Sequence, residues 1–188
     1  MKTDSKKRCE WCLKEQLYID YHDKEWGKPV HDDTKLFEFL ILESFQAGLS
    51  WLIVLRKREN FRKAFANYDA KKIKNFDAKK VEQLMQNEGI IRNRLKIEAA
   101  INNASRFLEI QKEFGSFDKY DWSFVGGKTI VNKRKSLKEL PAKTEISDAM
   151  SKDMGKRGFK FRGSTICYAF MQAVGMIDDH MDYCFKKL

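Results

Sequence analysis

The sequence predicts an all-α fold, and three observations carry that prediction. Apolar residues recur at every third or fourth position through most of the chain, which is the spacing of one helix face. Cap-forming residues precede several of these runs, and glycines follow some of them. Of the 188 residues, 43 % are hydrophobic and 2 are proline, a composition typical of a folded protein. We expect residues 1–188 to form one domain, organised as two helical lobes that share one core.

Two apolar helices are predicted in the first third of the chain. Asp33 or Thr34 offers an N-cap for a helix over 36–47, and Gly48 is the residue that ends it. Ser50 caps the next helix, 51–65, whose apolar residues repeat at helical spacing on one face. The other face of that second helix is basic.

Further helices are predicted beyond residue 65. Asp69 and Asp77 are expected to cap two short helices, and a longer helix carries an apolar stripe from Ile97 to Ile110. Residues 121–125 are expected to finish another short helix.

The last third of the chain mixes helices with one open segment. The segment 126–140 is rich in turn residues and basic, so we expect an exposed loop there. Ser147 caps a further helix, and the apolar residues 164–174 form a helix that ends at Gly175.

Charge narrows the classes of partner. Lysine and arginine number 37 against 27 acidic residues, a net charge of +10 that attracts nucleic acid or an anionic membrane. Of the two, we favour nucleic acid. No apolar stretch is long enough to span a membrane. The first eight residues contain no apolar run, so we expect no secretory signal and a cytoplasmic location. In that reducing compartment the four cysteines are thiols or metal ligands, and Cys167, among apolar neighbours, is expected to pack in the core.

One pattern suggests a metal site. His180 and Cys184 are four residues apart, so on a helix they face the same way. Thiolate and imidazole together suit Zn²⁺. Cys9 with His22 completes a Cys₂His₂ set and Cys9 with Cys12 completes a Cys₃His set; the spacing leaves both open. Unrelated thiols and surface histidines explain the same spacing equally well.

A second pattern combines one acid with aromatic residues. Glu43 shares the apolar face of its helix with Leu36 and Leu40, and a buried carboxylate is costly unless a partner or a ligand answers it. The neighbouring aromatic residues can be ordinary core, or they can line a slot that stacks a planar and preferably cationic ring. They are Trp11, Tyr18, Tyr21, Trp26 and Trp51.

Five motifs now appear in order along the chain: Y-H-D-K-E-W-G (21–27), L-E-S-F-Q-A-G-L-S-W (42–51), G-I-I-R-N-R (89–94), K-R-G-F-K-F-R-G (156–163) and D-H-M-D-Y-C (179–184). Together they resemble the 3-methyladenine DNA glycosylase I family, from Cys9 to Cys184. That family belongs to the helix-hairpin-helix DNA glycosylases, all-α proteins that flip a damaged base out of duplex DNA and hydrolyse its glycosidic bond.

The resemblance implies roles for individual residues. It implies a structural Zn²⁺ that joins the N- and C-terminal segments (9–22 and 180–184) through Cys9, His22, His180 and Cys184. It assigns Glu43 to recognition of the base, and Trp11, Tyr21 and Trp51, with Trp26 and Tyr18 close by, to the walls of the pocket. Asp178 and Asp179 are expected to orient His180 or to face solvent.

The resemblance also implies how DNA is held. Gly48 and Leu49 match the turn that enters the gap left by the flipped nucleotide. The hairpin corresponds to 158–163, and Gly163, Ser164 and Thr165 open the following helix toward a phosphate. Further affinity is expected from basic residues, namely Arg56, Lys57, Arg58, Arg92, Arg94, Lys156, Arg157, Lys160 and Arg162.

The expected function is therefore release of free 3-methyladenine from alkylated double-stranded DNA by a monomer that contacts no membrane. No lysine suggests itself as a Schiff-base nucleophile, so we expect a monofunctional glycosylase without strand cleavage. The alternative is a zinc-stabilised, non-catalytic DNA-binding module. A third hypothesis, a metal-dependent hydrolase, requires an open coordination position at the metal.

Overall fold

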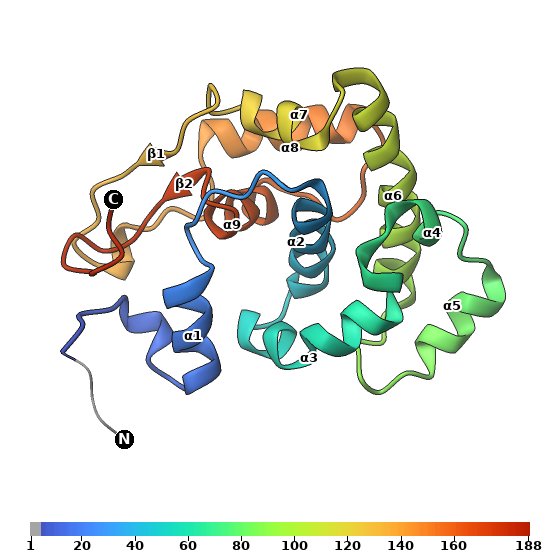
Figure 1. Cartoon of the computed structure of the whole chain (residues 1–188), viewed down its shortest axis with the longest axis horizontal. Helices are drawn as coiled ribbons and strands as arrows, with labels where there is room; N and C mark the ends of the chain where they lie inside the picture. Colours follow the sequence, from blue (N-terminus) through green and yellow to red (C-terminus); the bar gives the residue numbers. More distant parts are fainter. Residues whose placement is uncertain (1–4) are drawn as a thin grey trace.

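A computed structural model describes residues 5–188, and helices form nearly all of its regular structure (Figure 1). The α-helices are α1 (Gln16–Lys24), α2 (Asp33–Gln46), α3 (Trp51–Ala64), α4 (Ala70–Ile73), α5 (Ala78–Met85), α6 (Arg94–Phe114), α7 (Phe117–Ser123), α8 (Glu145–Lys156) and α9 (Ser164–Ala173). Three short 3₁₀ turns accompany them, η1 (Glu10–Cys12), η2 (Ala66–Tyr68) and η3 (Leu137–Glu139). The predicted helical class is thus confirmed; residues 1–4, part of the polar start of the chain, lie outside the described residues.

Helix α2 lies at the centre of the molecule. It packs against α3, α6, α7 and α9, and every residue from Leu36 to Phe45 is buried. A helix that is covered on all sides needs apolar residues all round, and any acid within it needs a cation or a hydrogen-bond donor as a partner. Glu38 has one, because Arg58 donates to its carboxylate and Lys35 lies 2.9 Å from it. Glu43, on the same helix, has no such cation among residues 5–188.

Two predicted side-chain caps are confirmed and two are wrong, while Ser50 precedes α3 without a side-chain cap bond. The side chains of Asp69 and Asp77 accept backbone N–H groups at the starts of α4 and α5, as predicted. Helix α2 is capped by Asp32, which accepts from the N–H of Lys35, and not by Asp33 or Thr34. The carboxylate of Asp33 accepts the N–H groups that open α7 instead.

Helix α8 starts three residues earlier than the sequence suggested. Thr144 is its N-cap, and Ser147 occupies the third helical position of a reciprocal capping box. A serine hydroxyl can act at the N-cap or, as here, at the third helical position, so the sequence pattern alone did not tell the cap from its partner.

The segment 126–140 is less open than predicted. Its strand β1 (Ile130–Val131) pairs in parallel with β2 (Ile177–Asp178). These two strands form the one β-sheet among the described residues. Arg134 binds the buried carboxylate of Asp179 at 2.9 Å. The segment is therefore tied to the C-terminal end of the chain.

The C-terminal segment corrects another prediction. Residues 180–184 follow β2 as turns and not as a helix, so His180 and Cys184 do not share a helix face. In Figure 1 this segment and the N-terminal segment lie on the same side of the molecule. The two ends meet through tertiary folding, which sequence spacing does not describe.

None of the helices within residues 5–188 is long and apolar enough to cross a membrane.

Candidate functional site

One pocket gathers the acid and the aromatic residues singled out in the sequence. Its volume is about 230 Å³, and it lies between α1, α2, the start of α3, α9 and η3. All six predicted residues line it, namely Trp11, Tyr18, Tyr21, Trp26, Glu43 and Trp51. We call it the aromatic pocket.

Glu43 is the acid of this pocket. It is 3 % exposed, and its Oε2 accepts no hydrogen bond from any residue in the described part of the chain. Burial without a compensating cation raises the pKa of Glu43 from its ordinary 4.5 to about 8. A carboxyl group without a cationic partner, on a buried helix and facing a pocket, is typical of a group that binds a ligand.

The aromatic walls are arranged edge to face and tilted, and not as a closed stack. The Tyr21 ring lies 5.5 Å from the Trp51 ring, and the Trp11 ring lies 5.0 Å from Trp26 and 4.8 Å from Tyr18. Open aromatic faces of this kind attract a flat, positively charged ring. The Nε1 of Trp51 is also buried without a hydrogen-bond acceptor among residues 5–188, so it is a second polar group left for a ligand.

Both pocket tyrosines keep their hydroxyl protons. Burial, and then the nearby Glu43 carboxylate, raise the pKa of Tyr18 to about 12 and that of Tyr21 well above its ordinary value of 10. The two phenols are therefore hydrogen-bond donors to whatever enters the pocket.

Sequence reasoning missed five residues of the pocket wall, namely Gln46, Leu137, Leu140, Ala169 and Gln172. Gln46 follows Glu43 by three residues on the same helix, a spacing that was available as a signal. Leu137 and Leu140 belong to the segment expected to be an exposed loop. The pairing of β1 with β2 and the ion pair of Arg134 with Asp179 hold this segment against the C-terminal segment, and its two leucines lie at the pocket.

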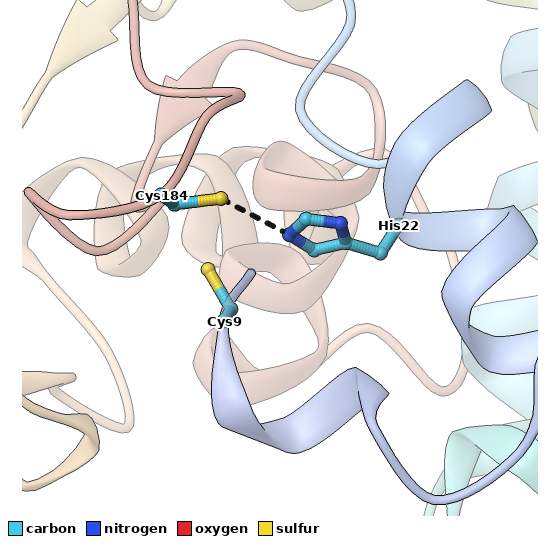
Figure 2. Close-up of side chains that lie close together, drawn as sticks. All are labelled: Cys9, His22 and Cys184. Atoms are coloured by element: carbon cyan, nitrogen blue, oxygen red, sulfur yellow. Dashed lines mark hydrogen bonds between the residues drawn. The ribbon is translucent and has the colours of Figure 1, made fainter. Parts of the chain in front are cut away.

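A cluster of cysteine and histidine lies beside the pocket. The ligand atoms of Cys9, His22 and Cys184 lie within 4.8 Å of one another, and all three residues are buried. Figure 2 shows the three side chains converging from the two ends of the chain, with His22 Nε2 3.4 Å from the sulfur of Cys184. We call these three residues the Cys–His cluster.

The surroundings of this cluster fit a zinc ion. Asp23 holds Nδ1 of His22 at 2.8 Å, which leaves Nε2 free for a metal. Asp178 likewise holds Nδ1 of His180 at 2.7 Å, and Nε2 of His180 is buried with no hydrogen-bond partner among the described residues. The His180 ring lies 5.2 Å from that of His22. His180 is not one of the three clustered ligand atoms. With it the set would comprise two thiols and two imidazoles, each ring held by a carboxylate, which is the donor set that tetrahedral Zn²⁺ prefers.

The neighbouring acid and the extra cysteine have other roles. The carboxylate of Asp179 accepts from Arg134, Tyr168, Asn132 and Gln172, and within residues 5–188 it makes no hydrogen bond to the His180 ring. Asp178 is the acid that orients that ring. Cys12 is buried, and its thiol donates to the Cys9 carbonyl at 3.1 Å. It is not one of the three clustered ligand atoms.

Two elements with a predicted role in DNA binding lie together beside the pocket. Gly48 has φ +82°, which favours glycine and allows the tight 47–50 turn, with Leu49 exposed at its tip. The same turn and Thr165 line a cavity of about 320 Å³. Gly163 is the N-cap of α9 and has no side chain to cap it, so within residues 5–188 the N–H groups that open α9, that of Ser164 among them, lack a side-chain cap. Such free donors suit a phosphate.

Two arginines of the predicted basic surface are held by contacts inside the protein. The Arg58 guanidinium donates to Glu25 and Glu38 and is 11 % exposed, so it is a core ion pair. Arg162 turns inward and donates to the carbonyls of Ser151 and Phe159. Arg56, Arg94 and Arg157 pair with Glu15, Glu82 and Glu113 near the surface. Lys156, just before the hairpin, and Lys160, within it, are exposed.

Comparison with known proteins agrees with this arrangement. A model of the methyladenine glycosylase family matches residues 11–187. DNA-3-methyladenine glycosylase of Haemophilus influenzae is 51 % identical over 177 residues, covering 94 % of this chain and 96 % of the relative. A crystal structure of 3-methyladenine DNA glycosylase I superimposes with a TM-score of 0.94 at 48 % identity, over 97 % of this chain and 100 % of that one. A variant of 3-methyladenine DNA glycosylase I in complex with 3-methyladenine gives a TM-score of 0.93 at 35 % identity, over 96 % and 97 %. The chain therefore belongs to the methyladenine glycosylase family.

Proposed function

We propose that this chain is a DNA glycosylase that releases 3-methyladenine from alkylated double-stranded DNA. The observation that carries the proposal is Glu43, a buried carboxyl group with no cation, in a pocket walled by tryptophan and tyrosine. Membership of the family and the relatives named for this activity support it.

The chemistry of the damaged base explains why such a pocket suffices. Methylation at N3 gives the adenine of the nucleotide a positive charge, which weakens its bond to the sugar. A cation gains from the aromatic faces and from the Glu43 carboxylate, whereas neutral adenine gains less from both. Binding of the cation favours the charged form of Glu43, so its proton, held up to a pKa of about 8 in the empty pocket, leaves for solvent.

The reaction is a hydrolysis. The bond between N9 and C1′ breaks, and the base departs with the electron pair as neutral 3-methyladenine. Water adds its hydroxyl to C1′ and its proton goes to solvent, so the sugar is left without a base. Tyr18 and Tyr21 supply hydroxyl donors to the base and Glu43 supplies the acceptor.

Strand cleavage is not part of the proposed reaction. A lyase step needs an amine that attacks C1′ and forms a Schiff base. The residues that line the aromatic pocket include no lysine. We therefore propose a monofunctional enzyme.

The 47–50 turn and the start of α9 are proposed to hold the duplex. Leu49 lies exposed at the tip of the turn, where it fills the gap that the flipped nucleotide leaves. Gly163, Ser164 and Thr165 offer backbone donors to a phosphate. The enzyme is proposed to act as a monomer, since both elements and the pocket belong to one chain.

A structural zinc ion is proposed at the Cys–His cluster, with His180 as the fourth ligand. Bound there, the ion would supply a crosslink between the N- and C-terminal segments. A closed set of four protein ligands leaves no position for a substrate, which argues against the metal-dependent hydrolase. His22 belongs to the same helix as Tyr21, so the crosslink fixes one wall of the pocket.

The test is an assay of bases released from methylated duplex DNA. The chain should release 3-methyladenine, and Glu43→Gln should release it at least about 10-fold more slowly, because the variant lacks the anionic acceptor. Salt-dependent DNA binding with no released base would support the non-catalytic DNA-binding module instead. Treatment of the product DNA with alkali should be needed before strand breaks appear.

A further inference from the structure

A buried lysine stands out because it has no acidic partner among the described residues. Lys96 is 6 % exposed, and its ammonium group donates to the carbonyls of Phe45 and Ala47 at 2.8 and 2.6 Å. Those carbonyls belong to the last turn of α2, where helix carbonyls lack partners. The carbonyl between them, that of Gln46, accepts from the N–H of Leu49. The end of α2 and the 47–50 turn are therefore held together at three successive carbonyls.

The position of Lys96 on its own helix makes this contact unusual. Lys96 lies in the first turn of α6, where the helix dipole disfavours a cation. Burial without a carboxylate adds a further cost. A cation at the C-terminal end of α2 is favoured. The contact with α2 therefore compensates for the unfavourable dipole of α6 and for the cost of burial.

Two turns further along, the same helix holds the hairpin. The side-chain amide of Asn103 donates to the Lys160 carbonyl at 2.9 Å and accepts the Lys160 N–H at 2.8 Å. Its neighbour Asn102 donates to the Gly158 carbonyl at 2.8 Å. Asn103 is 2 % exposed, so this double hydrogen bond is made away from solvent.

Lys96 and Asn103 are seven residues apart, which puts them on one face of α6. Helix α6 packs against α2, and Lys96 reaches the last turn of α2 from this face. Ser44 of α2 completes the link, since its hydroxyl lies 3.1 Å from the Phe161 carbonyl in the hairpin. One helix thus holds both elements by side-chain contacts to their backbone.

We propose that Lys96 and Asn103 are positioning residues that set the spacing between the 47–50 turn and the 158–163 hairpin for duplex DNA. The proposal rests on the proposed function, because it takes these two elements as the ones that hold DNA. Neither residue lines the aromatic pocket. Loss of either side chain should weaken the binding of duplex DNA, because both elements must contact one duplex together.

The test separates the duplex from the free base. Lys96→Met and Asn103→Ala should each slow single-turnover release of 3-methyladenine from duplex DNA by about 10-fold or more. Affinity for a duplex with a stable abasic-site analogue should fall by a similar factor. Affinity for free 3-methyladenine, measured by tryptophan fluorescence, should stay within about twofold. Lys96→Arg keeps a cation with several donors and should recover part of the loss.

Matched controls come from exposed residues of α4 and of the turn that follows it. Lys72→Met removes the same charge from α4, and Asn75→Ala removes a side-chain bond to the Lys71 carbonyl at 2.9 Å. Both should match the wild-type chain in every assay. The proposal is overturned if Lys96→Met and Asn103→Ala lose free-base affinity together with release, a general loss of structure, or if they keep full activity on duplex DNA. Abasic-duplex affinity that falls in these variants, when the wild-type chain releases no base, would contradict the proposed function alone.

Discussion

Tyr21 and His22 are consecutive residues of α1 whose side chains enter two different sites. The Tyr21 ring lies 5.5 Å from the Trp51 ring in the aromatic pocket. The Nε2 of His22 lies 3.4 Å from Cys184 Sγ in the Cys–His cluster. Neighbouring helix residues point in directions about 100° apart, so a single turn of α1 forms a wall of both sites. A change that moves α1 at the cluster therefore moves the pocket.

The first prediction concerns metal content. Elemental analysis should find one zinc ion per chain, and Cys9→Ser and Cys184→Ser should lose it, because each removes a thiolate ligand. Cys12→Ser is the matched control and should keep the ion, since the Cys12 thiol donates to the Cys9 carbonyl. Loss of zinc in Cys12→Ser with retention in Cys9→Ser would show that the ligand set is wrong.

The second prediction links Glu43 to stability against pH. Folding raises the pKa of Glu43 from 4.5 to about 8, so between those values the folded chain keeps a proton that the unfolded chain releases. The contribution of Glu43 to stability is therefore present below pH 4.5 and is lost as the pH rises toward 8. Relative to the wild-type chain, Glu43→Gln should gain on the order of 5 kcal/mol across this window in urea unfolding.

Glu38 of the same helix provides the control for that measurement. Burial alone would raise the pKa of Glu38, but the hydrogen bond and charge of Arg58, together with Lys35, outweigh it and lower the pKa. Its contribution is therefore present above pH 4.5 and is lost below it, so Glu38→Gln should be less stable than the wild-type chain at neutral pH. If both variants change stability with the same sign at neutral pH, the assignment of Glu43 as an unanswered carboxyl group is wrong.

A third prediction concerns a pocket wall that the sequence did not reveal. Leu137 lines the aromatic pocket, and Leu137→Ala should weaken binding of free 3-methyladenine by about 3- to 10-fold through lost apolar contact. Leu188→Ala, at an exposed leucine outside the pocket lining, is the control and should bind as the wild-type chain does. Equal affinities for all three proteins would remove η3 from the binding site.

The fourth prediction tests the absence of lyase chemistry. Borohydride added during the reaction traps a Schiff base between an enzyme amine and C1′ of the sugar. The residues lining the aromatic pocket include no lysine, so no covalent complex with DNA should form while base is released. A stable enzyme–DNA adduct on a denaturing gel would contradict the monofunctional reaction.

Local sequence signals predicted the helices well because caps and periodicity act over a few residues. Asp69 and Asp77 show this, since each caps the helix that follows it. The signal failed where two residues compete for one role. Asp32 and Asp33 both suit an N-cap, and the choice was decided by α7, whose N–H groups Asp33 accepts from a distant part of the chain.

The site was predicted in part for a similar reason. Glu43 stood out because an acid on an apolar helix face is costly wherever it occurs. The inward turn of Arg162 and the approach of Leu137 to the pocket depend on contacts with residues far away in sequence, such as Ser151 for Arg162. A helical arrangement of His180 and Cys184 was wrong, since these residues lie in turns after β2.

The measurement that tests the central claim most directly compares 3,9-dimethyladeninium, a fixed cation with a methyl group in place of the sugar, with neutral 9-methyladenine as ligands. Tryptophan fluorescence should report tighter binding of the cation than of 9-methyladenine by the wild-type chain, and Glu43→Gln should lose most of that preference while keeping weak binding to the aromatic walls. A Glu43→Gln variant that keeps the full preference would contradict the account, since selection would then not depend on the buried carboxylate.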